Sequence, residues 1–161
     1  MAIIVEDGSI VAGANSYVSE AELTAYATQR GVTLTGGTEA LLVKATDYLQ
    51  TLEYIGDKKT ADQPLLWPRR NVTIDGFEFS SEEIPDELKN AQLALAVSID
   101  EGNDPMATIG RKTRKEKVDV LEIEYADNSA SAAIITSVNR ILAKLLSGGG
   151  VGGGFFPVVR I

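Results

Sequence analysis

Apolar residues recur at helical spacing along most of this chain, which predicts a mainly helical protein. The first helix is expected from Ser19 to Arg30, because Ser19 and Glu22 have the spacing of a capping box and Gly31 can stop the helix. A second helix is expected from Thr38 to Gly56. Its predicted buried face consists of Leu41, Leu42, Ala45, Tyr48, Leu49, Leu52 and Ile55.

Two further helices follow in the second half of the chain. Pro85 suits the first turn of the third helix, and Gly102 and Pro105 mark its end. Its apolar stripe is broad, which predicts a central position between other elements. The stripe consists of Leu88, Ala91, Leu93, Leu95, Ala96, Val97 and Ile99. The fourth helix is expected from about Ala132 to Leu146.

The β signals are fewer. The pair Asp75-Gly76 separates two alternating runs, which predicts a hairpin that pairs Ile74 with Phe77 and Val72 with Phe79 on one apolar face. Residues 3–5 suggest a brief strand or a docked segment, and 118–125 a longer, half-exposed strand. Residues 57–63 are expected to form a charged loop and 64–70 an apolar turn. The predicted class is therefore mainly α with a small β element (α+β).

The C-terminal end differs from the rest. Six of the seven residues 148–154 are glycine, which favours a flexible linker over a packed element. Burying several apolar side chains of the tip that follows would gain about 1.5–3 kcal/mol each. We therefore expect a helical domain over 1–147 and a linker with a docking arm over 148–161, a disordered tail being the alternative. The arm residues are Phe155, Phe156, Pro157, Val158, Val159 and Ile161.

Composition narrows the possible chemistry. The chain has 161 residues with no cysteine and no histidine, which excludes thiolate and imidazole catalysis and the usual zinc sites. Adjacent carboxylates such as Glu82/Glu83 and Asp86/Glu87 lie near expected helix ends, where capping explains them. We expect no catalytic residue, no cofactor and no metal, with a carboxylate-based hydrolase as an alternative. Neither a signal peptide nor a membrane-spanning segment is indicated.

Charge is unevenly distributed. The formal net charge is −8, but residues 1–110 carry −11 and residues 111–161 carry +3. Such an acidic protein is a poor candidate for tight binding to duplex DNA. The basic stretch is either a solvated loop or a contact for nucleic acid or an acidic partner, although it lacks the interleaved aromatics typical of single-strand binding. Its residues are Arg111, Lys112, Arg114, Lys115 and Lys117.

Several short motifs occur together in an order that is more specific than any one of them. They are Ile3–Gly8, Ala14–Ser19, Ala45–Leu49, Leu66–Arg69, Asp75-Gly76 and Ile84–Ala91. Because these motifs occur in this order, the chain resembles the tailed-phage head–tail connector (adaptor) proteins of the family labelled DnaT-like single-stranded-DNA-binding. The resemblance covers about residues 1–125, and the last helix is similar in kind. The glycine-rich linker and apolar tip depart from the family pattern.

The resemblance implies a structural subunit of a bacteriophage virion. Many copies, typically twelve, would form a ring that binds the portal protein, receives tail-completion proteins and extends the DNA channel. The protein would then be located at the head–tail interface of the virion, and in the host bacterial cytoplasm during assembly. An acidic body is compatible with a channel through which DNA slides. The family label implies an alternative, a single-stranded-DNA-binding replication accessory protein.

Overall fold

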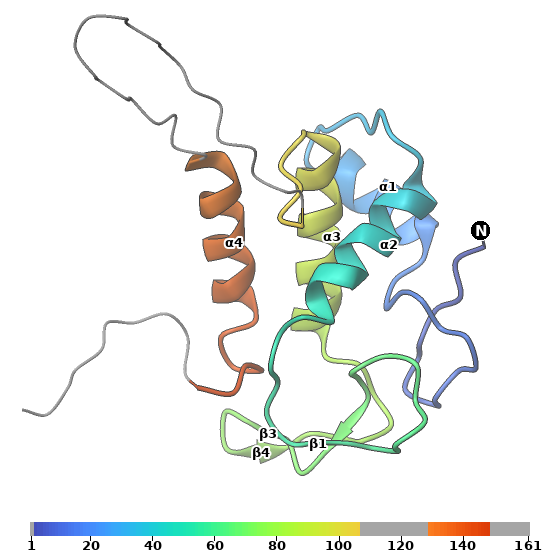
Figure 1. The fold of residues 1–161 in the computed structure, drawn as a ribbon, viewed down its shortest axis with the longest axis vertical. Helices are drawn as coiled ribbons and strands as arrows, with labels where there is room; N and C mark the ends of the chain where they lie inside the picture. Colours follow the sequence, from blue (N-terminus) through green and yellow to red (C-terminus); the bar gives the residue numbers. More distant parts are fainter. Residues whose placement is uncertain (1, 107–128, 149–161) are drawn as a thin grey trace, which may run out of the picture.

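The computed structural model describes residues 2–106 and 129–148, with side chains omitted for 129–134. Within these ranges the chain forms four helices and two small antiparallel strand pairs, which confirms the predicted mainly helical α+β class (Figure 1). The elements are α1 Glu20–Gln29, α2 Thr38–Leu49, β1 Asp57–Lys58, β2 Arg69–Arg70, β3 Thr73–Ile74, β4 Phe77–Glu78, α3 Asp86–Asp100 and α4 Ser129–Ile141.

Helix α3 is the centre of the body. It packs against α1 and α2 on one side and against α4 on the other, and Figure 1 shows it between them. Nine of its fifteen residues are buried, which agrees with the broad apolar stripe in its sequence. Pro85 stands just before the helix rather than in its first turn, and Gly102, at a positive φ of 93°, follows its end.

Helix α1 forms as its local sequence predicts. The Ser19 backbone N–H donates to Glu22 Oε2 at 2.7 Å, and the Ser19 hydroxyl accepts from the Glu22 N–H at 3.3 Å, which completes the capping box. Val18 and Leu23 flank the cap and are fully buried. Gly31 follows the helix at a positive φ of 68°.

Helix α2 ends at Leu49, seven residues before the predicted Gly56. The extension to Gly56 was wrong because side chains capture the carbonyl groups that further helical turns would have used. Thr51 Oγ1 donates to the Tyr48 carbonyl at 2.6 Å, and Tyr54 Oη donates to the Leu49 carbonyl at 3.0 Å. The chain after Leu49 therefore leaves the helix axis and runs toward the strands.

Helix α4 also differs from its expected range, beginning three residues earlier and ending at Ile141 instead of Leu146. The next residues pair with the chain that follows α2. The Ile55 N–H donates to the Leu145 carbonyl and the Ser147 N–H to the Glu53 carbonyl, both at 2.9 Å. Leu142 and Leu145 are fully buried. This segment thus fastens α4 to the loop between α2 and β1.

The hairpin is β3–β4, with the predicted register of Ile74 opposite Phe77. Asp75 and Gly76 have φ values of 52° and 85°, as a type I′ turn requires. Phe77 departs from the expected buried face, because its side chain is 78% exposed at the hairpin tip. The pair β1–β2 lies where a charged loop and an apolar turn were expected. At the N-terminus, Val5 bridges to Ser16, so residues 3–5 form a docked segment.

Several expectations fall outside the described residues. They include the strand over 118–125, nearly all of the 148–161 arm, and hence the proposed division at residue 147. Among the residues that the structure describes, no helix is long and apolar enough to cross a membrane.

Candidate functional site

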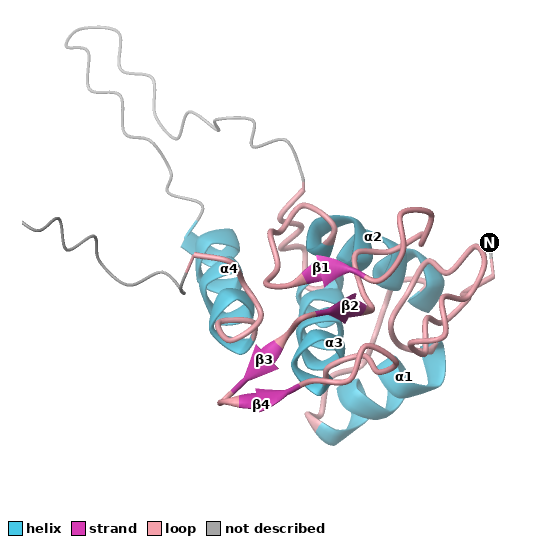
Figure 2. Ribbon diagram, turned by 90° about the horizontal axis from the view of Figure 1, so that it is seen from below, coloured by secondary structure: helices cyan, strands magenta, loops and turns pink. Residues whose placement is uncertain are grey.

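The four short strands gather at one end of the helical body, as Figures 1 and 2 both show. We call residues 57–59 and 69–81 the strand end. This region contains the two strand pairs and the chain that leads from β4 toward α3. It also contains adjacent basic pairs, Lys58-Lys59 and Arg69-Arg70, in a body whose first 110 residues are strongly acidic.

Pairing of β1 with β2 places these cations together. Lys58 lies opposite Arg69, and Asp57 lies opposite Arg70. The Asp57 carboxylate accepts a hydrogen bond from Asn71 Nδ2 at 3.0 Å. The two-stranded ribbon therefore brings Lys58 beside Arg69 on one face and Arg70 beside the Asp57 carboxylate on the other.

Arg69 has a structural task. Its guanidinium donates to the carbonyl groups of Ile55 at 2.7 Å, Tyr54 at 3.2 Å and Gly56 at 2.6 Å, with a longer bond to Leu66 at 3.4 Å. Burial lowers the pKa of Arg69 from its usual value, although the nearby Asp57 carboxylate opposes that shift. This side chain holds the loop after α2 in place and is not available to a ligand.

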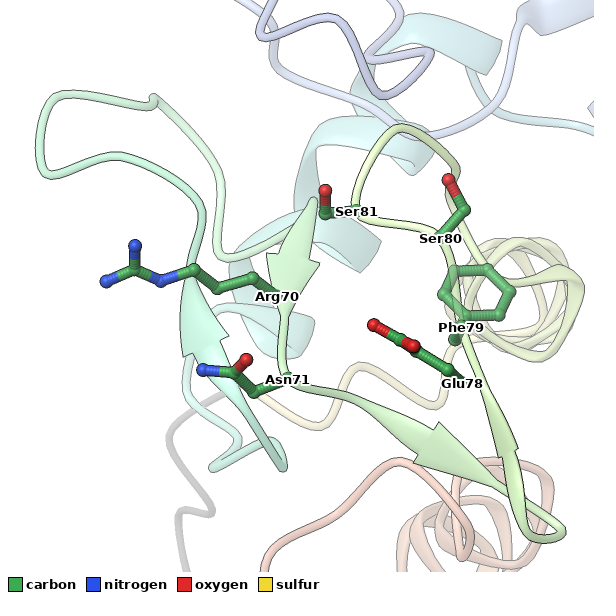
Figure 3. Close-up of a pocket in the computed structure, with 6 residues that line it drawn as sticks. All are labelled: Arg70, Asn71, Glu78, Phe79, Ser80 and Ser81. Atoms are coloured by element: carbon green, nitrogen blue, oxygen red, sulfur yellow. The ribbon is translucent and has the colours of Figure 1, made fainter.

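Arg70 differs from its neighbour. Its side chain is exposed, and the guanidinium has no hydrogen bond or ion pair within the described part of the chain. It lies at the rim of an open hollow of about 300 Å³. Figure 3 shows the guanidinium pointing away from this hollow, while the Glu78 carboxylate points inward from the opposite side. The hollow is lined by Arg70, Asn71, Glu78, Phe79, Ser80 and Ser81.

The hairpin tip presents an aromatic ring to solvent. Phe77 follows the turn, and within that turn the Asp75 carboxylate accepts from Lys144 Nζ at 2.6 Å. Both partners of this ion pair are more than half exposed, so it contributes little to stability. The tip thus combines an exposed ring with a cation from the segment after α4.

A second hollow, of about 410 Å³, lies beside the segment that follows Ser81. Lys59 reaches across it, with Nζ 3.8 Å from Glu82 Oε1 and 3.4 Å from the Gly8 carbonyl. Asp7 accepts from the Ser9 hydroxyl and N–H, and these bonds lower the pKa of Asp7. The polar groups that line this second hollow therefore contact one another.

The residues predicted as contacts lie outside the part of the chain that the structure describes. The basic stretch Arg111, Lys112, Arg114, Lys115 and Lys117 lies outside the described residues. So do Phe155, Phe156, Pro157, Val158, Val159 and Ile161. The acidic pairs are at chain turns and helix ends, with Asp86 and Glu87 in the first turn of α3. No group of three potential metal ligands occurs in 2–106 or 129–148.

Sequence reasoning missed the strand end as a candidate site. One signal was present, because Lys58-Lys59 and Arg69-Arg70 are the two adjacent basic pairs within the acidic first 110 residues. The exposure of Phe77 had no such signal, since an apolar residue in an alternating run is ordinarily expected on the buried face.

Comparison with protein-family models gives one informative match. Residues 1–161 match the model of a family described as "Putative DnaT-like ssDNA binding protein". The chain belongs to this family. Neither curated proteins nor solved structures give a significant match.

This family description contradicts the predicted head–tail connector, and the phage structural roles attached to that prediction are not supported. It favours the alternative of single-stranded DNA binding. The connector prediction rested on the resemblance of short motifs, and the acidic body did not test it, because weak attraction for duplex DNA suits a DNA channel and a modest single-strand binder equally well.

Proposed function

We propose that this protein binds single-stranded DNA, with the strand end as the contact surface. The observation that carries the proposal is the match of the whole chain to a family described as single-stranded-DNA-binding. The geometry of the strand end supports it. Single-strand binders combine aromatic rings, on which bases stack, with cations that attract the phosphates.

Phe77 is the aromatic contact in this proposal. It is 78% exposed and stands at the tip of a hairpin whose turn fixes its position. An exposed phenylalanine of this kind gains little from the fold itself. Stacking of one base on such a ring is worth about 1–3 kcal/mol.

Arg70 and Lys58 are the phosphate contacts. Arg70 is exposed and points outward, and Lys58 is on the adjacent strand of the same ribbon. Two or three phosphate contacts give a modest affinity that weakens with salt. Because the surrounding body is acidic, binding is expected in the micromolar range and not tighter. The basic stretch 111–117 is a second contact that would add to the salt dependence.

The test is a fluorescence anisotropy titration of a labelled thymidine oligonucleotide of about 20 nucleotides. We expect micromolar binding that falls by about 7- to 20-fold between about 50 and about 200 mM salt, from two or three neutralised phosphates. Phe77→Ala is expected to weaken binding by at least about fivefold. Met106→Ala is the matched control, because Met106 is also an exposed apolar residue, 52% exposed, but lies outside the strand end.

A charge series separates the two basic regions. Arg70→Ala with Lys58→Ala tests the strand end, and replacement of Arg111, Lys112, Arg114 and Lys115 by alanine tests the basic stretch. Lys44→Ala removes one exposed cation from α2 and serves as the control. Absence of oligonucleotide binding at low salt would refute the proposed function. Binding that depends on the basic stretch alone would refute the strand end as its surface.

A further inference from the structure

We propose that the hollow at the strand end takes one nucleobase that carries an exocyclic amino group, such as cytosine, in preference to thymine. This inference rests on the proposed function and adds a base preference to it. The hollow is the one lined by Arg70, Asn71, Glu78, Phe79, Ser80 and Ser81. Its volume of about 300 Å³ is at the lower end of ordinary small-ligand sites.

The charged group that points into the hollow is a hydrogen-bond acceptor. The Glu78 carboxylate points into the hollow, and it has no hydrogen bond or ion pair with any described residue (Figure 3). An ionised carboxylate can only accept hydrogen bonds. The Ser80 hydroxyl oxygen already accepts from the Glu82 N–H at 3.2 Å, so Glu78 remains the acceptor for a base.

Asn71 is held to one side for a specific reason. Its Nδ2 donates to Asp57 Oδ2 at 3.0 Å, and Figure 3 shows the carboxamide on the same side of the strand as the Arg70 guanidinium. The residue is in the left-handed region, with φ of 57°, where asparagine is more readily tolerated than most residues. Among the lining side chains drawn in Figure 3, the Glu78 carboxylate is therefore the acceptor that points into the hollow.

The remaining contacts suit a nucleotide. Phe79 contributes apolar surface, and its ring is held by an edge contact with Trp67 at a centroid distance of 6.2 Å. Its backbone N–H is bonded to the Val72 carbonyl at 2.9 Å, so the ring is positioned before any ligand arrives. Arg70 points outward at the rim. A base can thus enter the hollow while its phosphate remains near the guanidinium outside.

Acceptors on the protein discriminate between bases. Cytosine, adenine and guanine each offer an exocyclic amino donor, whereas thymine has only a ring N–H with a carbonyl oxygen on each side of it. A thymine that donated this N–H to Glu78 would bring a carbonyl oxygen close to the carboxylate. Because Glu78 is exposed to solvent, the added bond is taken at the strength of an ordinary net hydrogen bond, which predicts about threefold to tenfold tighter binding of cytosine.

The experiment compares deoxycytidine and thymidine homopolymers of about ten nucleotides, in anisotropy titrations at neutral pH, where cytosine is uncharged. We expect the wild-type protein to bind the cytidine oligomer about three- to tenfold more tightly. Glu78→Gln should reduce that ratio to near one. Glu83→Gln is the matched control, because it removes the same charge from an exposed residue that does not line the hollow.

A second variant guards against an indirect effect of any change at the rim. Asn71→Gly removes a lining side chain that points away from the hollow, and glycine accepts the positive φ of this position, so we expect an unchanged ratio and a folded hairpin. Thermal unfolding followed by circular dichroism checks the fold of each variant.

The outcomes distinguish this inference from the proposed function. Equal binding of the two oligomers by the wild-type protein overturns the base preference and leaves single-strand binding in place. A Glu78→Gln variant that binds both oligomers more tightly at an unchanged ratio shows simple charge repulsion and also overturns it. Absence of binding to either oligomer overturns the proposed function together with this inference.

Discussion

The helical core and the strand end use their polar side chains in opposite ways. Gln92 on α3 is fully buried, and its Nε2 donates to Ser16 Oγ and Thr46 Oγ1 at 2.8 Å and to the Leu42 carbonyl at 3.2 Å. Its Oε1 accepts from the Tyr17 N–H at 2.9 Å. Glu78 at the strand end has no partner among the described residues. The first side chain joins parts of the fold, and the second is left for a ligand.

Glu6 shows the same rule for a charged group. It is only 1% exposed, and its carboxylate accepts from the N–H groups of Gly8, Ile10 and Val11 at 2.9–3.0 Å. Backbone donors thus replace the water that the carboxylate has lost. Where the chain supplies every partner, a substitution should change stability. Where it supplies none, a substitution should change binding alone.

The largest expected effect is on stability, from Gln92→Ala. The change leaves the hydroxyls of Ser16 and Thr46 and the N–H of Tyr17 without their buried partner, and it opens a cavity in α3's packing. We expect the free energy of unfolding to fall by about 3–5 kcal/mol. Urea denaturation measures this. Gln29→Ala, at an exposed position of α1, should change the free energy of unfolding by less than about 0.5 kcal/mol. Equal losses in the two variants would contradict the role of Gln92.

The neighbours Arg69 and Arg70 sharpen the comparison. Arg69→Ala removes the donors that satisfy the carbonyls of Tyr54, Ile55 and Gly56, so the unfolding free energy should fall by about 2–3 kcal/mol. Arg70→Ala should leave stability within about 0.5 kcal/mol and weaken oligonucleotide binding. Urea denaturation and anisotropy on both variants test this. A destabilised Arg70→Ala protein would remove the distinction.

A smaller loss is expected for Glu6→Gln. The variant amide nitrogen would replace one carboxylate oxygen and face a backbone N–H, so two donors would oppose each other. We expect a loss of about 1–2 kcal/mol in the free energy of unfolding. Glu53→Gln, at an exposed position, is the control for charge. A stability loss of the same size in the control would show that the change in net charge is responsible, and not the loss of the hydrogen bonds between Glu6 and residues 8–11.

The smallest effect depends on pH. Asp100 accepts from the N–H groups of Thr35 at 2.9 Å and Gly36 at 2.6 Å, and these bonds lower its pKa below 3.8. Its stabilisation is therefore present above the unfolded pKa and is lost as the pH falls through the lower folded value. Asp100→Asn should lower the free energy of unfolding by less than about 1 kcal/mol at pH 7, and by less still near pH 3. Urea denaturation at both values measures it, and a cost that grows toward low pH would contradict this assignment.

The same contrast explains what could be read from the sequence. Helix α1 and the β3–β4 turn depend on residues within a few positions of one another, so Ser19, Glu22 and Asp75-Gly76 predicted them correctly. The chain after α4 depends on a distant partner, because the Leu145 carbonyl accepts from Ile55, and the end of α4 was misplaced. The end of α2 was misplaced although its determinants are local, because the side chains of Thr51 and Tyr54 bond to carbonyls only three and five residues back. Strands of two residues, such as β1 and β2, are too short for an alternating pattern.

The candidate site was harder to predict than the fold. The hollow is formed by β2, β4 and the chain after β4, and the face that Glu78 presents depends on how these segments meet. Gln92 was equally hidden, although a lone amide inside the apolar stripe of α3 is a signal for a buried hydrogen-bond network. Phe77 became a candidate only when its exposure was known.

Trp67 has a consequence for optical measurements. It is the single tryptophan of the chain, it is fully buried, and its ring meets Tyr54 and Phe79 edge-on at 5.9 and 6.2 Å. All indole emission therefore comes from one buried site. The Phe79 ring contacts this indole and also lines the hollow. The unmodified protein thus carries its own spectroscopic reporter for occupancy of that hollow, with no dye on either the chain or the oligonucleotide.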